Sequence, residues 1–276
     1  MTNLAFFFKQ RGAVGAAPVR ARHPLRSGRA LFGARWFAVG MAVAAVAWLL
    51  HVAAMTLAPL SDVQVVLAGG IVLVGVMADR VFGFPVARRQ WLGLALTATG
   101  LVAFALSAPG VHGAHASFSP AAMIAFELVL CLAGALLIAG PRAGAPRRHH
   151  GTMLGAASGI IFGASDISIK ALTGIVGAHG VLGLASPWLV VTALASIVAF
   201  FASAKSFQEG DAVPVIAITT ATANVSSIAG GILVFGDPMP GGAFGIVAQS
   251  LAIVAIVVAA AMRPSLGARR RAIATA

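Results

Sequence analysis

The sequence predicts an all-α polytopic membrane protein with about eight transmembrane helices in inverted repeats. Of its 276 residues, 59% are hydrophobic and 9% are charged, and the mean hydropathy is +0.97. A soluble domain of this size would need more polar residues to cover its surface. The apolar residues also fall into runs long enough to cross a bilayer, and basic residues occupy every second gap between those runs.

Eight apolar runs are close to the roughly 20 residues that a helix needs to cross a bilayer core of about 30 Å. In chain order they cover 36–57, 60–78, 91–107, 121–140, 152–175, 187–204, 213–235 and 243–262. The chain is therefore expected to comprise a basic N-terminal segment (1–35), a first repeat of three helices (36–107), a linking helix (121–140), a second repeat of four helices (152–262) and a basic tail (263–276).

The alternating charge indicates how the helices are oriented. Of the 19 Lys and Arg residues, all but Lys170 lie in the N-terminal segment, in every second gap or in the tail. Short basic loops remain in the cytoplasm, so we expect a plasma-membrane protein with both termini cytoplasmic. The net charge of +12 then points to contacts between cytoplasmic Arg residues and anionic lipids, and not to nucleic acid.

Two similar segments indicate an inverted repeat. Residues 68–74 in the second run resemble residues 229–235 in the seventh, and these two runs cross in opposite directions. Such pairs of inverted copies are typical of transporters that expose a central site to each side in turn. The alternative is a coincidence between Ala- and Gly-rich segments. The fifth run has no partner in the first half, and residues 3–12 resemble the cytoplasmic end of one, so we interpret them as the remnant of an additional N-terminal helix.

Three glycines in the fifth run predict a close helix contact. Gly155, Gly159 and Gly163 repeat every four residues and so share one helix face. Small residues at this spacing let a neighbouring helix approach closely in a membrane. The alternative is that glycine, with 32 residues, is simply abundant in this chain.

Five polar residues inside the apolar runs are the candidates for substrate or ion binding. They are His51, Glu127, Asp166, Lys170 and Asn224. An ionisable group in the membrane costs at least about 2.5–3.5 kcal/mol, so such groups usually face a cavity or a partner.

Each candidate also has a purely structural interpretation. Asp166 and Lys170 are spaced to pair along one helix face, and Lys170 could instead extend to the membrane surface. His51 is compatible with a packing role, and Asn224 and Gln64 with interhelical hydrogen bonds. Asp62 and Asp237 are expected at the hydrated outer surface.

Glu127 is the strongest sequence candidate for proton coupling. It has no basic residue nearby in the sequence, and desolvation favours the protonated form of such a carboxyl. Proton exchange through Asp166 is the alternative.

The sequence contains no common catalytic motif: zinc-protease, nucleophile-elbow and phosphate-binding motifs are all absent. Cys131 is the only cysteine, which excludes a disulfide framework within the chain and a Cys-based metal site. No enzymatic activity, cofactor or metal site is expected, and a homodimer is left open.

Three segments carry a resemblance to a known family. They are Ala58-Pro59-Leu60-Ser61, the run from Ser158 to Lys170 that ends Asp166-Ile-Ser-Ile-Lys170, and the run from Phe200 to Gly210 that continues into Val213-Pro214-Val215 and Thr219-Thr220. Together they resemble the drug/metabolite transporter superfamily, and most closely its NIPA-like group, which is related to EamA-type permeases. The resemblance extends from Leu4 to Met262 and implies nine helices, the first of them represented here only by its end.

The resemblance implies a secondary transporter of a small metabolite or drug-like solute. NIPA-like proteins are associated with Mg²⁺ movement, which makes a divalent-cation permease the first alternative. The acidic residue of that group is missing from the run at 36–57, where His51 is the nearest polar group, and Mg²⁺ prefers oxygen ligands. A scaffold or accessory subunit that transports nothing is the second alternative.

Overall fold

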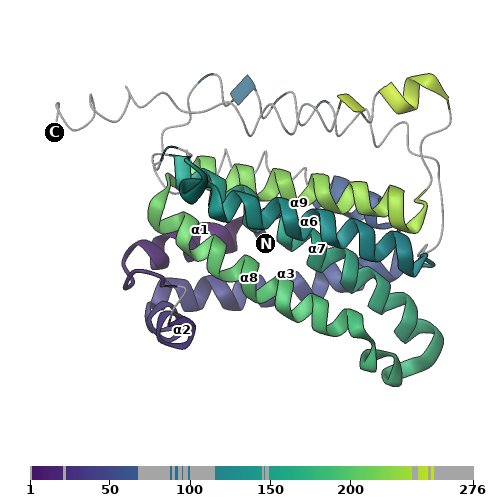
Figure 1. The fold of residues 1–276 in the computed structure, drawn as a ribbon, viewed down its shortest axis with the longest axis horizontal. Helices are drawn as coiled ribbons and strands as arrows, with labels where there is room; N and C mark the ends of the chain where they lie inside the picture. Colours follow the sequence, from purple (N-terminus) through teal and green to yellow (C-terminus); the bar gives the residue numbers. More distant parts are fainter. Residues whose placement is uncertain are drawn as a thin grey trace.

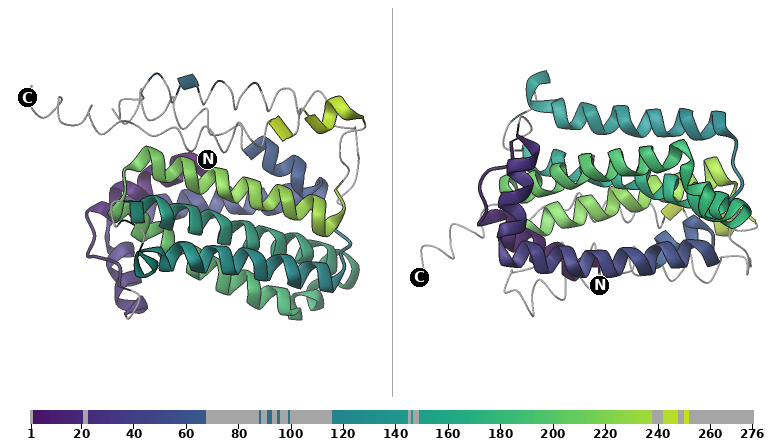
Figure 2. Two further views of the ribbon diagram at one scale, coloured as in Figure 1. Left: turned by 45° about the horizontal axis from the view of Figure 1, so that its top comes forward. Right: turned by 90° about the horizontal axis from the view of Figure 1, so that it is seen from below.

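The computed structural model describes residues 2–20, 23–67, 116–144, 146, 149–237 and 242–247, together with positions 88, 91, 92, 95, 99, 250 and 251. All regular structure in these segments is helical. The elements are α1 (Thr2–Val14), α2 (Pro24–Gly33), α3 (Arg35–Leu57), α6 (Pro120–Ala139), η1 (Gly140–Ala143), α7 (His150–His179), η3 (Gly180–Ala185), α8 (Pro187–Glu209) and α9 (Ala212–Phe235). Figures 1 and 2 show the five long helices lying side by side as a bundle.

Five of the eight predicted helices are confirmed in position. The helices α3, α6, α7, α8 and α9 are each long and apolar enough to cross a membrane, and they begin and end within a few residues of the predicted runs, except that α7 and α8 extend a turn further. Most of the runs at 60–78, 91–107 and 243–262 lies outside the described residues, although 60–67 and 243–247 are helical. The repeat copy at 68–74 also lies outside them.

Helix directions alternate as the charge pattern predicts. Asp166 of α7 contacts His51 of α3, and four residues later Lys170 contacts Met55, also four residues later. The residue numbers rise in the same direction, so these two helices are parallel. Helix α9 is also parallel to α7, because Thr219 meets Gly155 and Ser227 meets Asp166. Contacts with α6 and α8 run in the opposite order along α7, as hydrogen bonds from Ser158 to Ala199 and from Ser165 to Ser196 show for α8.

Helix α7 packs against α9 along its glycine face, which confirms the predicted close contact. A Cβ atom added to Gly159 would overlap the hydroxyl of Thr222 and the carbonyl of Thr219. A Cβ added to Gly155 would lie 3.0 Å from Ile218, and one added to Gly163 would lie 3.2 Å from the carbonyl of Ala223. The two backbones therefore approach each other more closely than any larger residue would allow.

Apolar side chains cover much of the outer surface. On α6, Leu128, Leu132 and Leu136 are 58%, 63% and 72% exposed and recur every four residues. A contiguous stripe of exposed leucines is unfavourable in water but suits hydrocarbon. Together with the five apolar helices, this supports a membrane-embedded protein.

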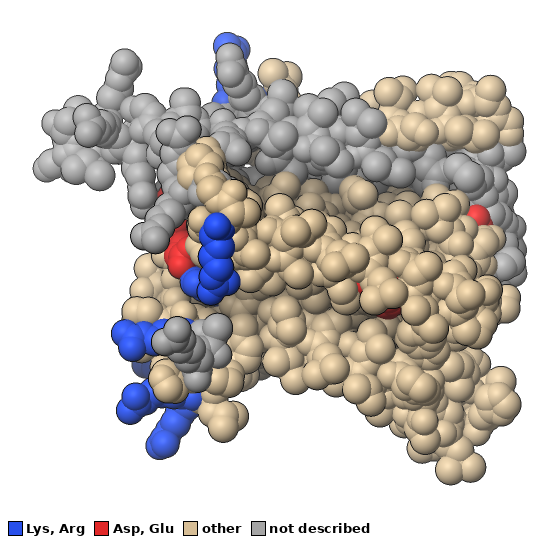
Figure 3. Space-filling model, in the orientation of Figure 1, with Lys and Arg blue, Asp and Glu red and all other residues tan. Residues whose placement is uncertain are grey.

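Basic residues of the described segments gather at one end of the bundle on the face that Figure 3 shows. Figure 3 shows the Lys and Arg side chains of the visible face lying toward the end where α1 and α2 are found. At this end α1 packs closely on α3, where Gly12 lies against Phe37 and Gly40 lies against Lys9. Lys170 does not belong to this group, because it is fully buried toward the opposite end.

Candidate functional site

Asp166 is the centre of the most extensive polar cluster among the described side chains. Its Oδ1 lies 3.3 Å from His51 Nε2. Its Oδ2 accepts hydrogen bonds from Gln64 Nε2 at 2.9 Å and from Ser227 Oγ at 3.1 Å. We call these four residues the Asp166 cluster.

The Asp166 cluster joins the two predicted halves of the chain. His51 on α3 and Gln64 in the helical segment 60–67 belong to the first repeat, whereas Asp166 on α7 and Ser227 on α9 belong to the second. The side chains of His51 and Asp166 are 10% and 19% exposed, so the pair is largely removed from the surface. Nδ1 of His51 is buried and has no hydrogen-bond partner within the described segments.

Lys170 does not pair with Asp166, although their spacing allows it. Its Nζ donates hydrogen bonds of 2.7 Å to the carbonyls of Met55 and Ala58, and its side chain is 0% exposed. These carbonyls lie at the C-terminal end of α3, where backbone acceptors lack partners within the helix. A cation there is also favoured by the helix dipole. Lys170 therefore caps α3.

Asp237 is buried, so the prediction that water would hydrate its carboxylate is wrong. It is 3% exposed, and its Oδ2 accepts a 2.8 Å hydrogen bond from the backbone N–H of Ser61. Ser61 lies in the first turn of the helical segment 60–67, where N–H groups lack partners within the helix. Asp237 thus caps this segment from a distant part of the chain.

Lys170 and Asp237 together hold the turn at residues 58–61 from both sides. The cation binds the carbonyls that enter the turn, and the carboxylate binds an N–H that leaves it. We call this arrangement the turn clamp. The turn belongs to the first predicted repeat and both charged residues belong to the second, so the clamp is a second connection between the halves.

Glu127 lies apart from the Asp166 cluster. On α6 it is 6% exposed, and its Oε1 accepts a 2.7 Å hydrogen bond from Ser168 Oγ. Ser168 and Asp166 are two residues apart on α7, so they point to different sides of that helix. The second oxygen of Glu127 is buried without a hydrogen-bond partner in the described part of the chain.

Asn224 lies one helical turn before Ser227 on the same face of α9. It is 4% exposed, and its Nδ2 has no hydrogen-bond partner among the residues that the structure describes. Of the five sequence candidates, the structure joins His51 and Asp166, whereas no hydrogen bond in the described residues links Glu127, Lys170 or Asn224 to either of them.

Ser227 is the member of the Asp166 cluster that sequence reasoning missed. A single serine in an Ala- and Ser-rich helix gives no signal by itself, but its spacing from Asn224 marks a polar face of α9. Gln64 was expected to make an interhelical hydrogen bond, and it does so with Asp166.

No group of three or more His, Cys, Asp or Glu side chains placed to hold a metal ion is found in the described residues. Comparisons with protein-family models, with curated proteins and with solved structures find no match to this chain.

Proposed function

We propose that this protein is a secondary transporter that moves a small solute by alternating access, with proton exchange at Asp166. The observation that carries the proposal is the position of the Asp166 carboxylate, which lies within an apolar helix and is bound by side chains from both predicted halves. Substrate and coupling-ion sites of transporters with repeated halves occur where those halves meet. The resemblance to drug/metabolite transporters supports the same function.

Protonation of Asp166 would change contacts on both sides of this interface. A carboxylate accepts stronger hydrogen bonds than a neutral carboxyl. Adding a proton therefore weakens the bonds from Gln64 and Ser227 and removes the charge beside His51. Because these partners come from different halves, one proton can shift the equilibrium between two arrangements of the halves.

The turn clamp suits a closed outer gate. In the proposed orientation, with termini in the cytoplasm of a plasma-membrane protein, α3 runs outward and its end at residues 58–61 faces the outside. Lys170 and Asp237 hold this end against the second half. Opening toward the outside would require these contacts to separate.

Asp166→Asn is expected to abolish solute-dependent proton movement while leaving the fold intact. The amide keeps the size of the carboxyl but cannot exchange a proton. The measurement uses proteoliposomes with an entrapped pH-sensitive dye, to which a panel of small organic solutes is added from outside. Thermal unfolding in detergent verifies that the variant is folded.

Glu127→Gln is the matched control, because it also replaces a buried carboxyl by its amide. Glu127 lies on α6 and contacts a side of α7 different from the one that carries Asp166. We expect this variant to retain solute-dependent proton movement. Loss in Glu127→Gln with retention in Asp166→Asn would move the proton site to Glu127. If the wild-type protein moves no proton with any solute but admits Mg²⁺ to a magnesium-sensitive dye, it is a cation permease. If it does neither, a scaffold role replaces transport.

A further inference from the structure

Helix α2 lies at the basic end of the bundle and runs across the direction of the long helices. Figure 1 shows α2 nearly end-on, whereas α3 and α8 run across the view. Where the long helices cross a membrane, a helix with this orientation lies along the membrane surface. Trp36 follows α2 by three residues and is 43% exposed, and indole rings prefer the level of the lipid headgroups. These observations place α2 at that level.

One side of α2 is fixed against the protein. Leu31 is 0% exposed and packs in a core that includes Phe37 and Phe207. Ser27 Oγ accepts a 3.0 Å hydrogen bond from the backbone N–H of Arg20. Ser27 and Leu31 are four residues apart, so they share one face of the helix. Their contacts determine which face of α2 points outward.

The outward face of α2 combines apolar and basic side chains. Leu25 and Phe32 are 89% and 51% exposed, and Arg26 and Arg29 are exposed as well. Phe32 also stacks on Phe200 of α8, with ring centroids 6.1 Å apart, so the apolar side of α2 adjoins a helix that is long and apolar enough to cross a membrane. Helices of this composition lie in the membrane interface, with apolar side chains among the acyl chains and basic groups beside the headgroups.

The arginines of α2 have no acidic partner among the described residues. No Asp or Glu precedes Asp62 in the sequence, and the ion pairs recorded in the described segments involve neither Arg26 nor Arg29. The exposed leucine and phenylalanine are unfavourable in water. An anionic bilayer surface supplies negative charge for the arginines and hydrocarbon for the apolar side chains.

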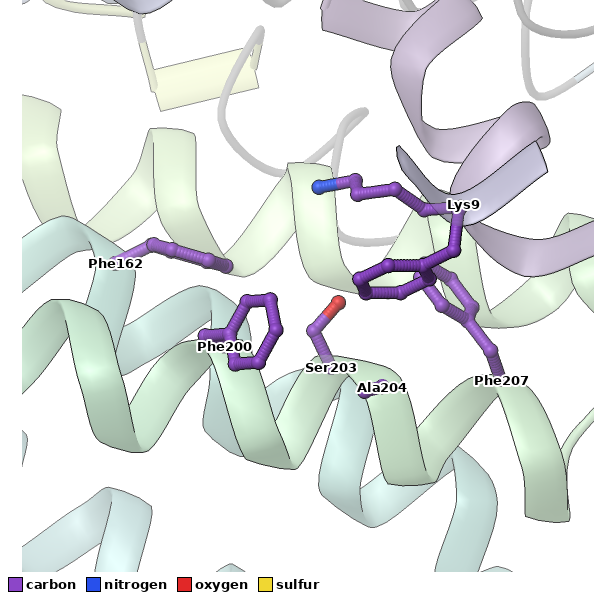
Figure 4. Close-up of a pocket in the computed structure, with 7 residues that line it drawn as sticks. Lys9, Phe162, Phe200, Ser203, Ala204 and Phe207 are labelled. Atoms are coloured by element: carbon purple, nitrogen blue, oxygen red, sulfur yellow. The ribbon is translucent and has the colours of Figure 1, made fainter. Parts of the chain in front are cut away.

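The pocket at this end of the bundle is too small for a lipid headgroup. Lys9, Phe200 and Phe207 are among the residues that line it, and it has room for no more than a water molecule. Figure 4 shows these three side chains converging on this space from α1 and α8. A headgroup cannot enter the bundle there and would meet the protein at its surface.

We propose that α2 is an interfacial helix that binds the headgroups of anionic phospholipids. Arg26 and Arg29 contact the lipid phosphates, and Leu25 and Phe32 lie among the upper parts of the acyl chains. The net charge of the chain predicts only that basic segments meet anionic lipids, whereas the structure assigns this contact to one helix. The proposal needs the bundle to lie in a membrane but does not depend on transport, so it can fail while the proposal for Asp166 stands.

The test places a fluorescent probe on α2 in the full-length protein in nanodiscs. Leu25→Cys is introduced together with Cys131→Ser, because Cys131 is the only native cysteine, and the new thiol is labelled with bimane. The nanodiscs contain phosphatidylcholine with or without phosphatidylglycerol. The quencher is either a phosphatidylcholine with a nitroxide near its headgroup or iodide in the water. We expect phosphatidylglycerol to raise quenching by the lipid and to lower quenching by iodide.

Arg26→Gln combined with Arg29→Gln should remove most of this response, because each arginine contributes about fivefold to binding at an anionic surface. Arg142→Gln combined with Lys205→Gln is the matched control, since it removes the same charge from positions outside α2. This control should respond to phosphatidylglycerol as the parent protein does.

Equal quenching in the two lipid compositions would overturn the proposal, and so would equal losses in the two double variants. Strong quenching by iodide in every nanodisc would also overturn it, because α2 would then lie in water. The comparison of lipid compositions in the parent protein keeps the test decisive even if the double arginine variant does not fold.

Discussion

Gly159→Val is expected to disrupt the packing of α7 against α9 and to lower the midpoint of thermal unfolding by roughly 5–10 °C. The added side chain has no space, because even a Cβ atom would overlap the Thr222 hydroxyl and the Thr219 carbonyl and lie 3.0 Å from the backbone nitrogen of Ala223. Two of these three atoms belong to the backbone of α9, so a rotamer change cannot relieve the overlap. The measurement is thermal unfolding of the purified protein in detergent.

Gly177→Val provides the control for this substitution. Gly177 lies on the same helix, and a Cβ atom added there would meet no other atom within 4 Å. It should unfold close to the wild-type midpoint, since an exposed substitution of this kind usually changes stability by less than about 0.5 kcal/mol. Equal losses in the two variants would show that the stability loss comes from valine in α7 and not from its contact with α9.

Lys170→Met is expected to destabilise the protein by about 2–4 kcal/mol, because it leaves two backbone acceptors without a donor. Lys170 donates to the carbonyls of both Met55 and Ala58 and is fully buried. Methionine retains most of the apolar volume, so the loss reports the ammonium group. The free energy of unfolding is measured by denaturant titration in detergent.

A double substitution tests whether Lys170 and Asp237 act as one clamp. If both hold the turn at residues 58–61, the effects of Lys170→Met and Asp237→Ala should not add, because the first loss already releases the turn. Lys205→Met serves as the reference for loss of a surface lysine, whose exposed ion pair contributes roughly 0–1 kcal/mol. Strict additivity would show two independent caps.

The helices themselves could be predicted from the sequence, because bilayer thickness sets their length and loop charge sets their direction. Both constraints act locally on the chain, which is why α3, α6 and α9 begin and end close to the predicted residues. The sequence predicted that a helix packs closely against Gly155, Gly159 and Gly163. It could not identify that helix as α9.

The sequence could not predict which groups form hydrogen bonds with Asp166 and Lys170. Spacing along α7 favoured a pair between Asp166 and Lys170, worth only about 0.2–0.5 kcal/mol on a helix surface. The fold instead offers Lys170 two unpaired carbonyls and Asp166 two hydrogen-bond donors besides His51. Such groups come from helix ends and side chains more than 60 residues away, and no local pattern identifies them.

The backbone conformation at the end of α9 restricts which residues can occupy position 236. Gly236 is exposed, and a Cβ atom there would touch nothing, yet its backbone lies in the left-handed region with φ of 65°. That conformation turns the chain so that Asp237 donates its N–H to Gly231 and reaches Ser61 with its carboxylate. A substitution at Gly236 would cost roughly 1–2 kcal/mol in backbone conformation alone. Its effect would appear at Ser61, 175 positions earlier in the sequence, where the helical segment 60–67 would lose its cap. The atoms around residue 236 give no sign of this effect.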